Sequence, residues 1–139
     1  MSVYTDTISF RTKGNTDVID ITPRLDELLQ KSGMREGFVV IHAVGSTGAV
    51  TTCEYEPGLV RDFKDIFDKL IPPGHYSHNE TWGDANGHSH LRASLVGPSI
   101  TVTFNNKRLL LGTWQQVVFI DFDTRSRQRE VAVQFVGEQ

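Results

Sequence analysis

The sequence predicts a single α+β domain in which mostly antiparallel strands form a sandwich-like arrangement with two to three helices. Short alternating or apolar segments, typical of strands, outnumber the segments with helical spacing. Residues 1–139 contain no linker, repeat or low-complexity stretch that would divide the chain. A chain of this length is long enough for one domain with a sizeable core.

The first part of the chain predicts four strands around one helix. A helix is expected to begin at Thr22-Pro23, because a hydroxyl cap precedes a proline in the first turn, and to end at Gly33. The glycines at positions 45 and 48 separate two apolar runs, and the run 37–44 predicts a central strand buried on both faces. The strands expected here span residues 3–10, 17–20, 37–44 and 49–54.

The clearest helix opens at Pro57-Gly58 and ends before Pro72-Pro73-Gly74. Its apolar stripe contains Leu59, Val60, Phe63, Ile66, Phe67 and Leu70. Residues 74–87 have no periodicity and are expected to form a loop. Asn86 is expected to cap a short helix that runs to Leu95 or Val96. The remaining strands are expected at 100–104, 108–112, 115–123 and 130–136, with a tight turn at Asn105-Asn106.

Composition limits the classes of function. Fourteen basic and seventeen acidic residues give a net charge of −3, which argues against binding of nucleic acid. No apolar run approaches the roughly 18 residues of a membrane span, and the first residues lack the pattern of a signal peptide. The single cysteine, Cys53, excludes an intramolecular disulfide and fits a reducing cytoplasm. We therefore expect a cytoplasmic protein that acts on small molecules or on protein partners.

The histidines are unevenly distributed, since four of the five lie between His75 and His90. His78, His88 and His90 would form a three-histidine metal site with an open position if the loop folds back on the helix start. Side chains two residues apart point about 200° apart in a helix. His88 and His90 therefore converge only if the helix begins between them or just after them. The alternatives are solvated or capping histidines, or a phosphate site in which Asn86 and the amides of the helix start bind an anion.

Three further segments carry polar groups that suit ligand binding. The hydroxyls of Ser46 and Thr47, between two glycines, suit an anion, although a polar hairpin corner is an equal interpretation. Glu54 at a strand end is a candidate general base or simply a solvated residue, and the neighbouring cysteine is expected to pack rather than react. Trp114 and Gln115 offer a flat aromatic face and an amide to a ligand. The alternative is that the tryptophan packs in the core.

Seven ordered segments resemble the YjbQ-like family, also called the secondary thiamine-phosphate synthase family, and together they cover essentially the whole chain. The matching segments are Ser46-Thr47-Gly48-Ala49-Val50, Glu54-Tyr55-Glu56-Pro57-Gly58, Tyr76-Ser77-His78, Gly83 to Leu91, Ala93-Ser94-Leu95-Val96-Gly97, Leu111 to Gln116, and Val133 to Glu138. The resemblance implies a homotrimer with a divalent metal ion (zinc, manganese or magnesium) near a subunit boundary. It also implies weak thiamine-phosphate synthase activity, which joins a pyrimidine diphosphate to a thiazole phosphate with loss of pyrophosphate.

Carried over by position, the resemblance assigns roles to particular residues. His78, His88 and His90 would be the metal ligands, and Asp84 would be a ligand or would orient one. The hydroxyls of the 46–47 turn would donate to a phosphorylated small molecule, with Arg92 as a charge partner and Asn86, Trp114 and Gln115 lining the same cleft. Glu54 is the expected general base, and with Asp84 it makes up the expected catalytic pair.

Two positions depart from the pattern of the family, because this chain has Gly45 where many members have histidine and Cys53 where they have asparagine. The first departure removes an imidazole from the expected site. The alternative to an enzyme is a non-catalytic, trimeric binding or assembly protein that keeps a metal or phosphate site.

Overall fold

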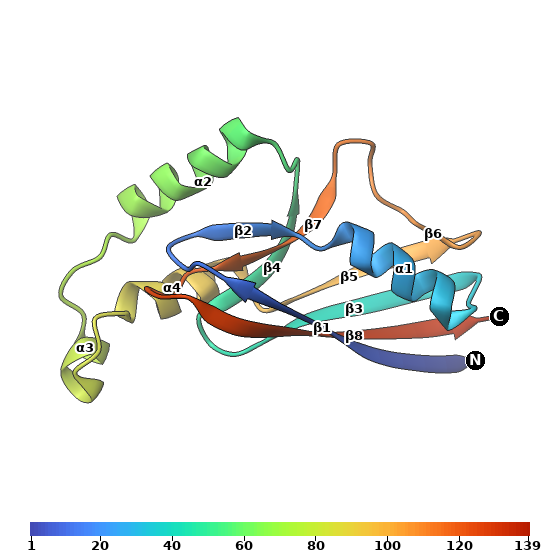
Figure 1. Cartoon of the computed structure of the whole chain (residues 1–139), viewed down its shortest axis with the longest axis horizontal. Coiled ribbons are helices and arrows are strands. Elements are labelled where there is room, and N and C mark those ends of the chain that lie inside the picture. The colour runs from blue at the N-terminus through green and yellow to red at the C-terminus, as the bar shows by residue number, and fades with distance from the viewer.

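The computed structural model describes residues 1–139 as two antiparallel sheets, which confirms the predicted α+β class (Figure 1). The larger sheet contains, in spatial order, β1 (Ser2–Thr12), β8 (Arg127–Glu138), β3 (Glu36–Val44), β5 (Ser99–Asn105) and β6 (Arg108–Leu109). The smaller sheet contains β2 (Asp17–Asp20), β7 (Gln116–Asp121) and β4 (Gly48–Cys53). There are four helices instead of the two to three that we predicted.

Three connections lead from one sheet to the other at the same end of the molecule. They are residues 13–16, 45–47 and 122–126, between β1 and β2, β3 and β4, and β7 and β8. Backbone hydrogen bonds join them: the amide of Phe122 donates to the carbonyl of Thr47 at 2.9 Å, and that of Asn15 donates to the carbonyl of Asp123. We call this end the sheet junction. The chain termini lie at the opposite end (Figure 1).

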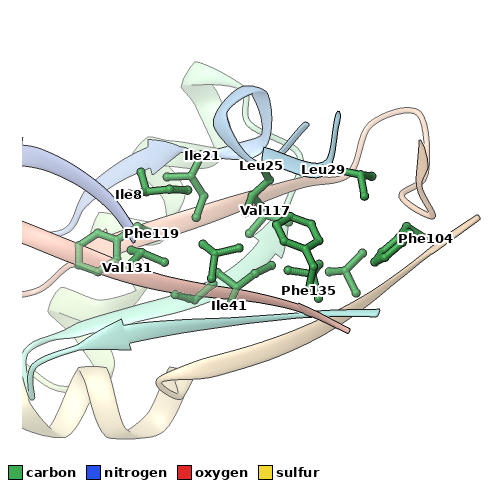
Figure 2. Packing of buried hydrophobic residues seen from close by; sticks show 14 of the residues in the cluster. Ile8, Ile21, Leu25, Leu29, Ile41, Phe104, Val117, Phe119, Val131 and Phe135 are labelled. Atoms are coloured by element: carbon green, nitrogen blue, oxygen red, sulfur yellow. The ribbon is translucent and has the colours of Figure 1, made fainter. Parts of the chain in front are cut away.

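Helix α1 (Thr22–Ser32) covers the main core. Leu25 and Leu29, one helical turn apart, point from α1 toward the strands and are fully buried (Figure 2). Gly33 ends the helix in the left-handed conformation, as predicted. The expected cap was wrong, because the hydroxyl of Thr22 exchanges hydrogen bonds with the backbone of Val117 in β7.

Helix α2 (Pro57–Leu70) begins and ends close to its predicted positions, but its apolar stripe is only partly covered. The carboxylate of Glu56 caps the helix by accepting from two amides of the first turn. Phe67 is buried against Phe122, with ring centroids 4.8 Å apart. Further along the stripe, Ile66 and Leu70 remain 48% and 62% exposed. Helix α2 therefore retains an apolar surface that this subunit does not bury.

Two short helices follow where we predicted a loop and one helix. Helix α3 (Ser77–Trp82) lies inside the expected loop, and α4 (Gly87–Val96) matches the expected short helix. The six residues of α3 are too few to show a helical period, so the sequence pattern could not indicate them. The predicted strand 108–112 begins as expected but ends at Leu109, so only β6 remains. The tight turn falls on Asn106 and Lys107, which both have positive φ, one residue later than predicted. No helix is long and apolar enough to cross a membrane.

Candidate functional site at the sheet junction

The segment that contains α3 and α4 is fastened to the sheet junction by side chains of α4 and its cap. The amide nitrogen of Asn86 donates to Asp123 at 3.4 Å, and the ring of His90 lies near the backbone of Ser46. The histidine-rich segment and the 46–47 hydroxyl turn, forty residues apart in the sequence, are therefore neighbours. The sequence predicted this proximity only through the family resemblance.

A single asparagine fixes α3 relative to α4. The side chain of Asn79 accepts from the amide of Gly87 at 2.9 Å and donates to the carbonyl of Gly74 at 2.9 Å. A Cβ at position 87 would lie only 2.7 Å from the Cβ of Tyr76, so the helices can approach this closely only because residue 87 is glycine. Sequence reasoning missed Asn79, although it expected a capped start of α4.

This packing brings two of the three predicted metal ligands together. The rings of His78, from α3, and His90, from α4, lie with centroids 4.4 Å apart and planes tilted by 45°. Nδ1 of His78 is buried and has no hydrogen-bond partner. Burial and the neighbouring charge of His78 lower the pKa of His90, while the charges of Asp123 and Asp84 oppose the shift. Both effects favour the neutral ring, the form in which imidazole binds metals.

The third predicted ligand, His88, does not join this pair. Helix α4 begins at Gly87, before both histidines, so residues 88 and 90 point in different directions. His88 is buried, its Nδ1 has no partner, and burial followed by the charge of Arg92 lowers its pKa. No group of three or more His, Cys, Asp or Glu side chains is arranged to hold a metal ion. The three-histidine set that we expected is therefore corrected to a histidine pair.

A buried charge network occupies the interior of the junction. Asp121, fully buried, accepts from Nε and Nη2 of Arg129 at 2.7 and 2.9 Å. Nη2 also donates to the hydroxyl of Thr47 at 2.6 Å. The hydrogen bonds and charge of Asp121 outweigh burial and raise the pKa of Arg129, so the guanidinium remains charged. The network holds the two sheets together at the point where they diverge.

A second carboxylate extends this network toward α4. Asp123 accepts from the amide of Thr124 at 2.8 Å, from the hydroxyl of Thr47 at 3.1 Å, and from Arg127. Burial alone would raise the pKa of Asp123, but the hydrogen bonds from Thr124, Asn86 and Arg127 and the charge of Arg127 lower it. Asp123 is therefore a buried, ionised carboxylate whose charge acts on His90.

Three of the predicted phosphate-binding side chains are engaged within the protein. Thr47 is buried and donates to Asp123, so its hydroxyl is not available as we expected. Arg92 is 2% exposed and binds Asp68 and the carbonyl of Ile71, which ties α4 to the end of α2. Asn86 is also buried, and its Nδ2 bonds to a carboxylate. These residues position the junction, because burial removes them from an incoming anion.

Two predicted residues remain accessible near the histidine pair. Ser46 is exposed and lines a small pocket with Gly45 and Ser94. Asp84 is exposed and lines a polar pocket of about 240 Å³ that also contacts Asp123 and Arg127. Both lie close enough to His90 to affect its pKa, Ser46 through its backbone and Asp84 through its charge.

The other predicted residues lie at the opposite end of β4. Gly48 pairs with Asp121 at the junction, whereas Cys53 pairs with Gln116, five residues further along the strand. Five strand residues span about 17 Å, so Glu54, Trp114 and Gln115 do not share a cleft with the junction inside one subunit. Trp114 is 72% exposed, so it is no core residue. Gln115 donates to Thr52 and accepts from the amide of Gly112.

Sequence reasoning missed the charge network, although the sequence contains a signal for it. Asp121 and Asp123 alternate with apolar residues, and Arg127 and Arg129 repeat the same spacing across the turn. Side chains two residues apart on a strand share a face, so each charged pair points to the same side. Ion pairing of the two sets across the hairpin was therefore open to prediction. We placed the two aspartates in a strand and the two arginines before the next strand, and did not pair them.

The fold and the site define a small α+β protein whose two sheets diverge from a charged junction beside a histidine pair. Residues 6–138 match the model of the family described as "UPF0047 protein YjbQ-like". Among curated relatives, a UPF0047 protein of Methanothermobacter thermautotrophicus is 36% identical over 99% of this chain and 95% of its own length. The UPF0047 protein YugU of Bacillus subtilis is 32% identical over 94% of this chain and 98% of its own.

Solved structures agree with this assignment. A "YbjQ-like protein of unknown function" from Sulfolobus solfataricus has a TM-score of 0.92 at 28% identity and covers 99% of both chains. A hypothetical protein from Aeropyrum pernix has a TM-score of 0.91 at 32% identity and covers 97% of this chain and 99% of its own. The chain belongs to the UPF0047 (YjbQ-like) family, as the resemblance of its segments indicated.

Proposed function

We propose that the protein is a metal-dependent enzyme that acts on a phosphorylated small molecule, with weak thiamine-phosphate synthase activity as the named reaction. The observation that carries the proposal is the pair formed by His78 and His90 at the sheet junction. Two imidazoles on one ion, each at about 2.1 Å, place their ring centroids roughly 4.5–5.5 Å apart. The spacing of 4.4 Å is close to this range, so a small rotation of either ring suffices.

The residues present fit a divalent metal ion with open coordination positions. The buried Nδ1 of His78 has no partner, and burial lowers the pKa of His90, which favours its neutral ring. The exposed carboxylate of Asp84 adds negative charge near His90, although it does not complete a ligand set of three side chains. Zinc, manganese or magnesium bound here would neutralise the charge of a diphosphate. Histidine ligands favour zinc or manganese over magnesium, which prefers oxygen.

The substrate side of the proposal uses the accessible groups. In the named reaction a bond forms between the thiazole nitrogen and the pyrimidine methylene carbon, the bond from that carbon to the diphosphate oxygen breaks, and pyrophosphate leaves. Ser46, exposed next to the pair, would donate to a phosphate oxygen. The exposed ring of Trp114 suits stacking on a pyrimidine. Because this bond formation releases no proton, Glu54 would stabilise the positive charge that the thiazole nitrogen gains rather than act as the general base that we expected.

These last residues lie about 17 Å from the junction in one subunit, so the proposal includes the homotrimer. A cyclic trimer would place the Glu54 and Trp114 end of one subunit against the histidine pair of the next. The exposed apolar side chains support association, since Leu91 and Leu95 of α4 and Ile66 and Leu70 of α2 are largely uncovered within the subunit. Light scattering should give the mass of a trimer, and a monomer at working concentrations would contradict this part of the proposal.

Metal binding is tested on the untagged protein by elemental analysis before and after loading with zinc or manganese. We expect bound metal in the wild type, at least a tenfold loss of affinity in His78→Ala and His90→Ala, and no change in His75→Ala. The last variant is the matched control, because His75 is an exposed histidine of the same segment. Wild-type protein that remains metal-free after loading would refute the metal site.

Catalysis is tested by incubating the protein with the two thiamine precursors and the bound ion, with detection of thiamine phosphate by mass spectrometry. We expect slow product formation that Glu54→Ala and Asp84→Ala reduce at least tenfold. Metal binding and trimer formation without any product would instead support the second candidate, a trimeric binding or assembly protein. Product formation unchanged in both variants would refute the two assigned roles.

A further inference from the structure

The guanidinium of Arg129 has hydrogen-bond donors that the protein does not use. An arginine carries five N–H donors. In Arg129, Nε–H and one Nη2–H donate to Asp121, and the other Nη2–H donates to Thr47. The two N–H groups of Nη1 have no partner anywhere in the chain, although the side chain is only 7% exposed. Two free donors on so deeply buried a cation are unusual, because buried polar groups are normally paired.

The free nitrogen points toward a position that has no side chain. A Cβ added at Gly45 would lie 3.2 Å from Nη1 of Arg129, with no other atom within 4 Å. The space beside Gly45 is therefore open, and Nη1 is not among the unpaired polar atoms that are sealed from solvent. A pocket of about 110 Å³ lies on the same turn and is lined by Gly45, Ser46 and Ser94 among others, but Arg129 is not part of its lining. The opening that Nη1 faces is therefore the space left by the missing side chain of Gly45.

The location connects these donors to the histidine pair. Gly45 faces Arg129, and the backbone of the next residue, Ser46, lies near the ring of His90. The free donors and the histidine pair therefore lie beside adjacent residues of one turn. The carboxylates Asp121 and Asp123 already pair with guanidinium groups, so they leave Nη1 free to donate outward.

We infer that Nη1 of Arg129, uncovered because residue 45 is glycine, binds an oxygen of the ligand's phosphoryl group. The inference rests on the proposed function, because that proposal supplies the phosphorylated ligand. Arginine donors suit phosphoryl oxygens, since both hydrogens can point to one group in fixed geometry. Asp121 and Thr47 hold the guanidinium on its other side, so it needs no rearrangement on binding.

The test measures binding of inorganic pyrophosphate to the metal-loaded protein by calorimetry. Gly45→Ala places a methyl group against Nη1 and should weaken binding at least tenfold. Because Gly45 has a φ of +125°, this variant also introduces backbone strain, so Gly33→Ala is the matched control. Gly33 has a φ of +73°, and its added Cβ would meet only the flexible side chain of Gln139. We expect pyrophosphate to bind Gly33→Ala as it binds wild type.

A second measurement does not depend on a variant. In the nuclear magnetic resonance spectrum of the wild type, the side-chain N–H signals of Arg129 should shift when pyrophosphate is added. Unshifted signals, or equal affinity of Gly45→Ala and wild type, would overturn the inference. If His78→Ala abolishes pyrophosphate binding while Gly45→Ala preserves it, the metal site of the proposed function stands and the role of Arg129 falls. Failure of the wild type to bind pyrophosphate would refute both the inference and the phosphorylated ligand.

Discussion

Replacing Asp121 by asparagine tests the charge network more directly than any other change. The side chain is fully buried and accepts from Nε and Nη2 of Arg129, from the amide of Asp123 and from the hydroxyl of Thr12. Asparagine keeps the shape but removes the charge, and it turns one acceptor into a donor that faces the guanidinium. Arg129 would then be a buried cation without its counter-charge.

Removing one partner of a buried ion pair costs about 3–5 kcal/mol. A domain of this size has a free energy of unfolding of roughly 5–15 kcal/mol, so Asp121→Asn should lose a large fraction of it. The midpoint of thermal unfolding should fall by roughly 10–20 °C. Urea denaturation followed by circular dichroism measures the loss, and Glu130→Gln, an exposed carboxylate on the neighbouring strand, is the control.

A loss below about 1 kcal/mol in Asp121→Asn would refute the view that the pair holds the junction. The double variant Asp121→Leu with Arg129→Met provides a second check. Removing both charges avoids the isolated cation, so the double variant should lose less than the sum of its single variants. Additive losses would mean that the two side chains act independently.

Three further changes test other parts of the structure. The hydrogen bonds and Arg127 charge that lower the pKa of Asp123 stabilise the fold above about pH 4 and lose effect as pH falls below it. The midpoint of thermal unfolding should therefore fall more steeply from pH 7 to pH 3 for wild type than for Asp123→Asn. Parallel pH dependences of the two midpoints would contradict this stabilising role of the Asp123 carboxylate. Glu56→Ala, which removes the cap of α2, should cost about 1 kcal/mol in urea denaturation, whereas Glu54→Ala should cost almost nothing. Gly87→Ala should destabilise by about 1–3 kcal/mol through the clash between α3 and α4, whereas Gly74→Ala, with open space around it, should not.

Most of the fold followed from local patterns in the sequence. The alternation of residues 3–10 and the apolar run 37–44 correctly placed β1 and β3, because the side-chain period of a strand is visible in a single chain. Pro57-Gly58 correctly opened α2. Helix α3 escaped prediction because six residues with no apolar period give no signal. The position of α3 depends on hydrogen bonds from Asn79 to Gly74, before the helix, and to Gly87, after it. Helix propensities of the residues in α3 contain no information about these contacts.

The candidate site was predictable only in part. Clustering of histidines correctly drew attention to α3 and α4, and His78 and His90 do meet. The choice of His88 depended on where α4 begins, and helix boundaries are the least certain element of a sequence-based prediction. The free donors of Arg129 were beyond prediction, because they depend on which of five N–H groups find partners in three dimensions.

The meeting of three inter-sheet connections at one end has a consequence for how the protein responds to its environment. The core lies between the two sheets, and at the sheet junction backbone hydrogen bonds join the connections that pass from one sheet to the other. Strand β1 ends at the junction and β8 begins there, with Thr12 opposite Arg127. A ligand that stabilises the junction should therefore increase amide protection along β1 and β8, including residues remote from the bound group.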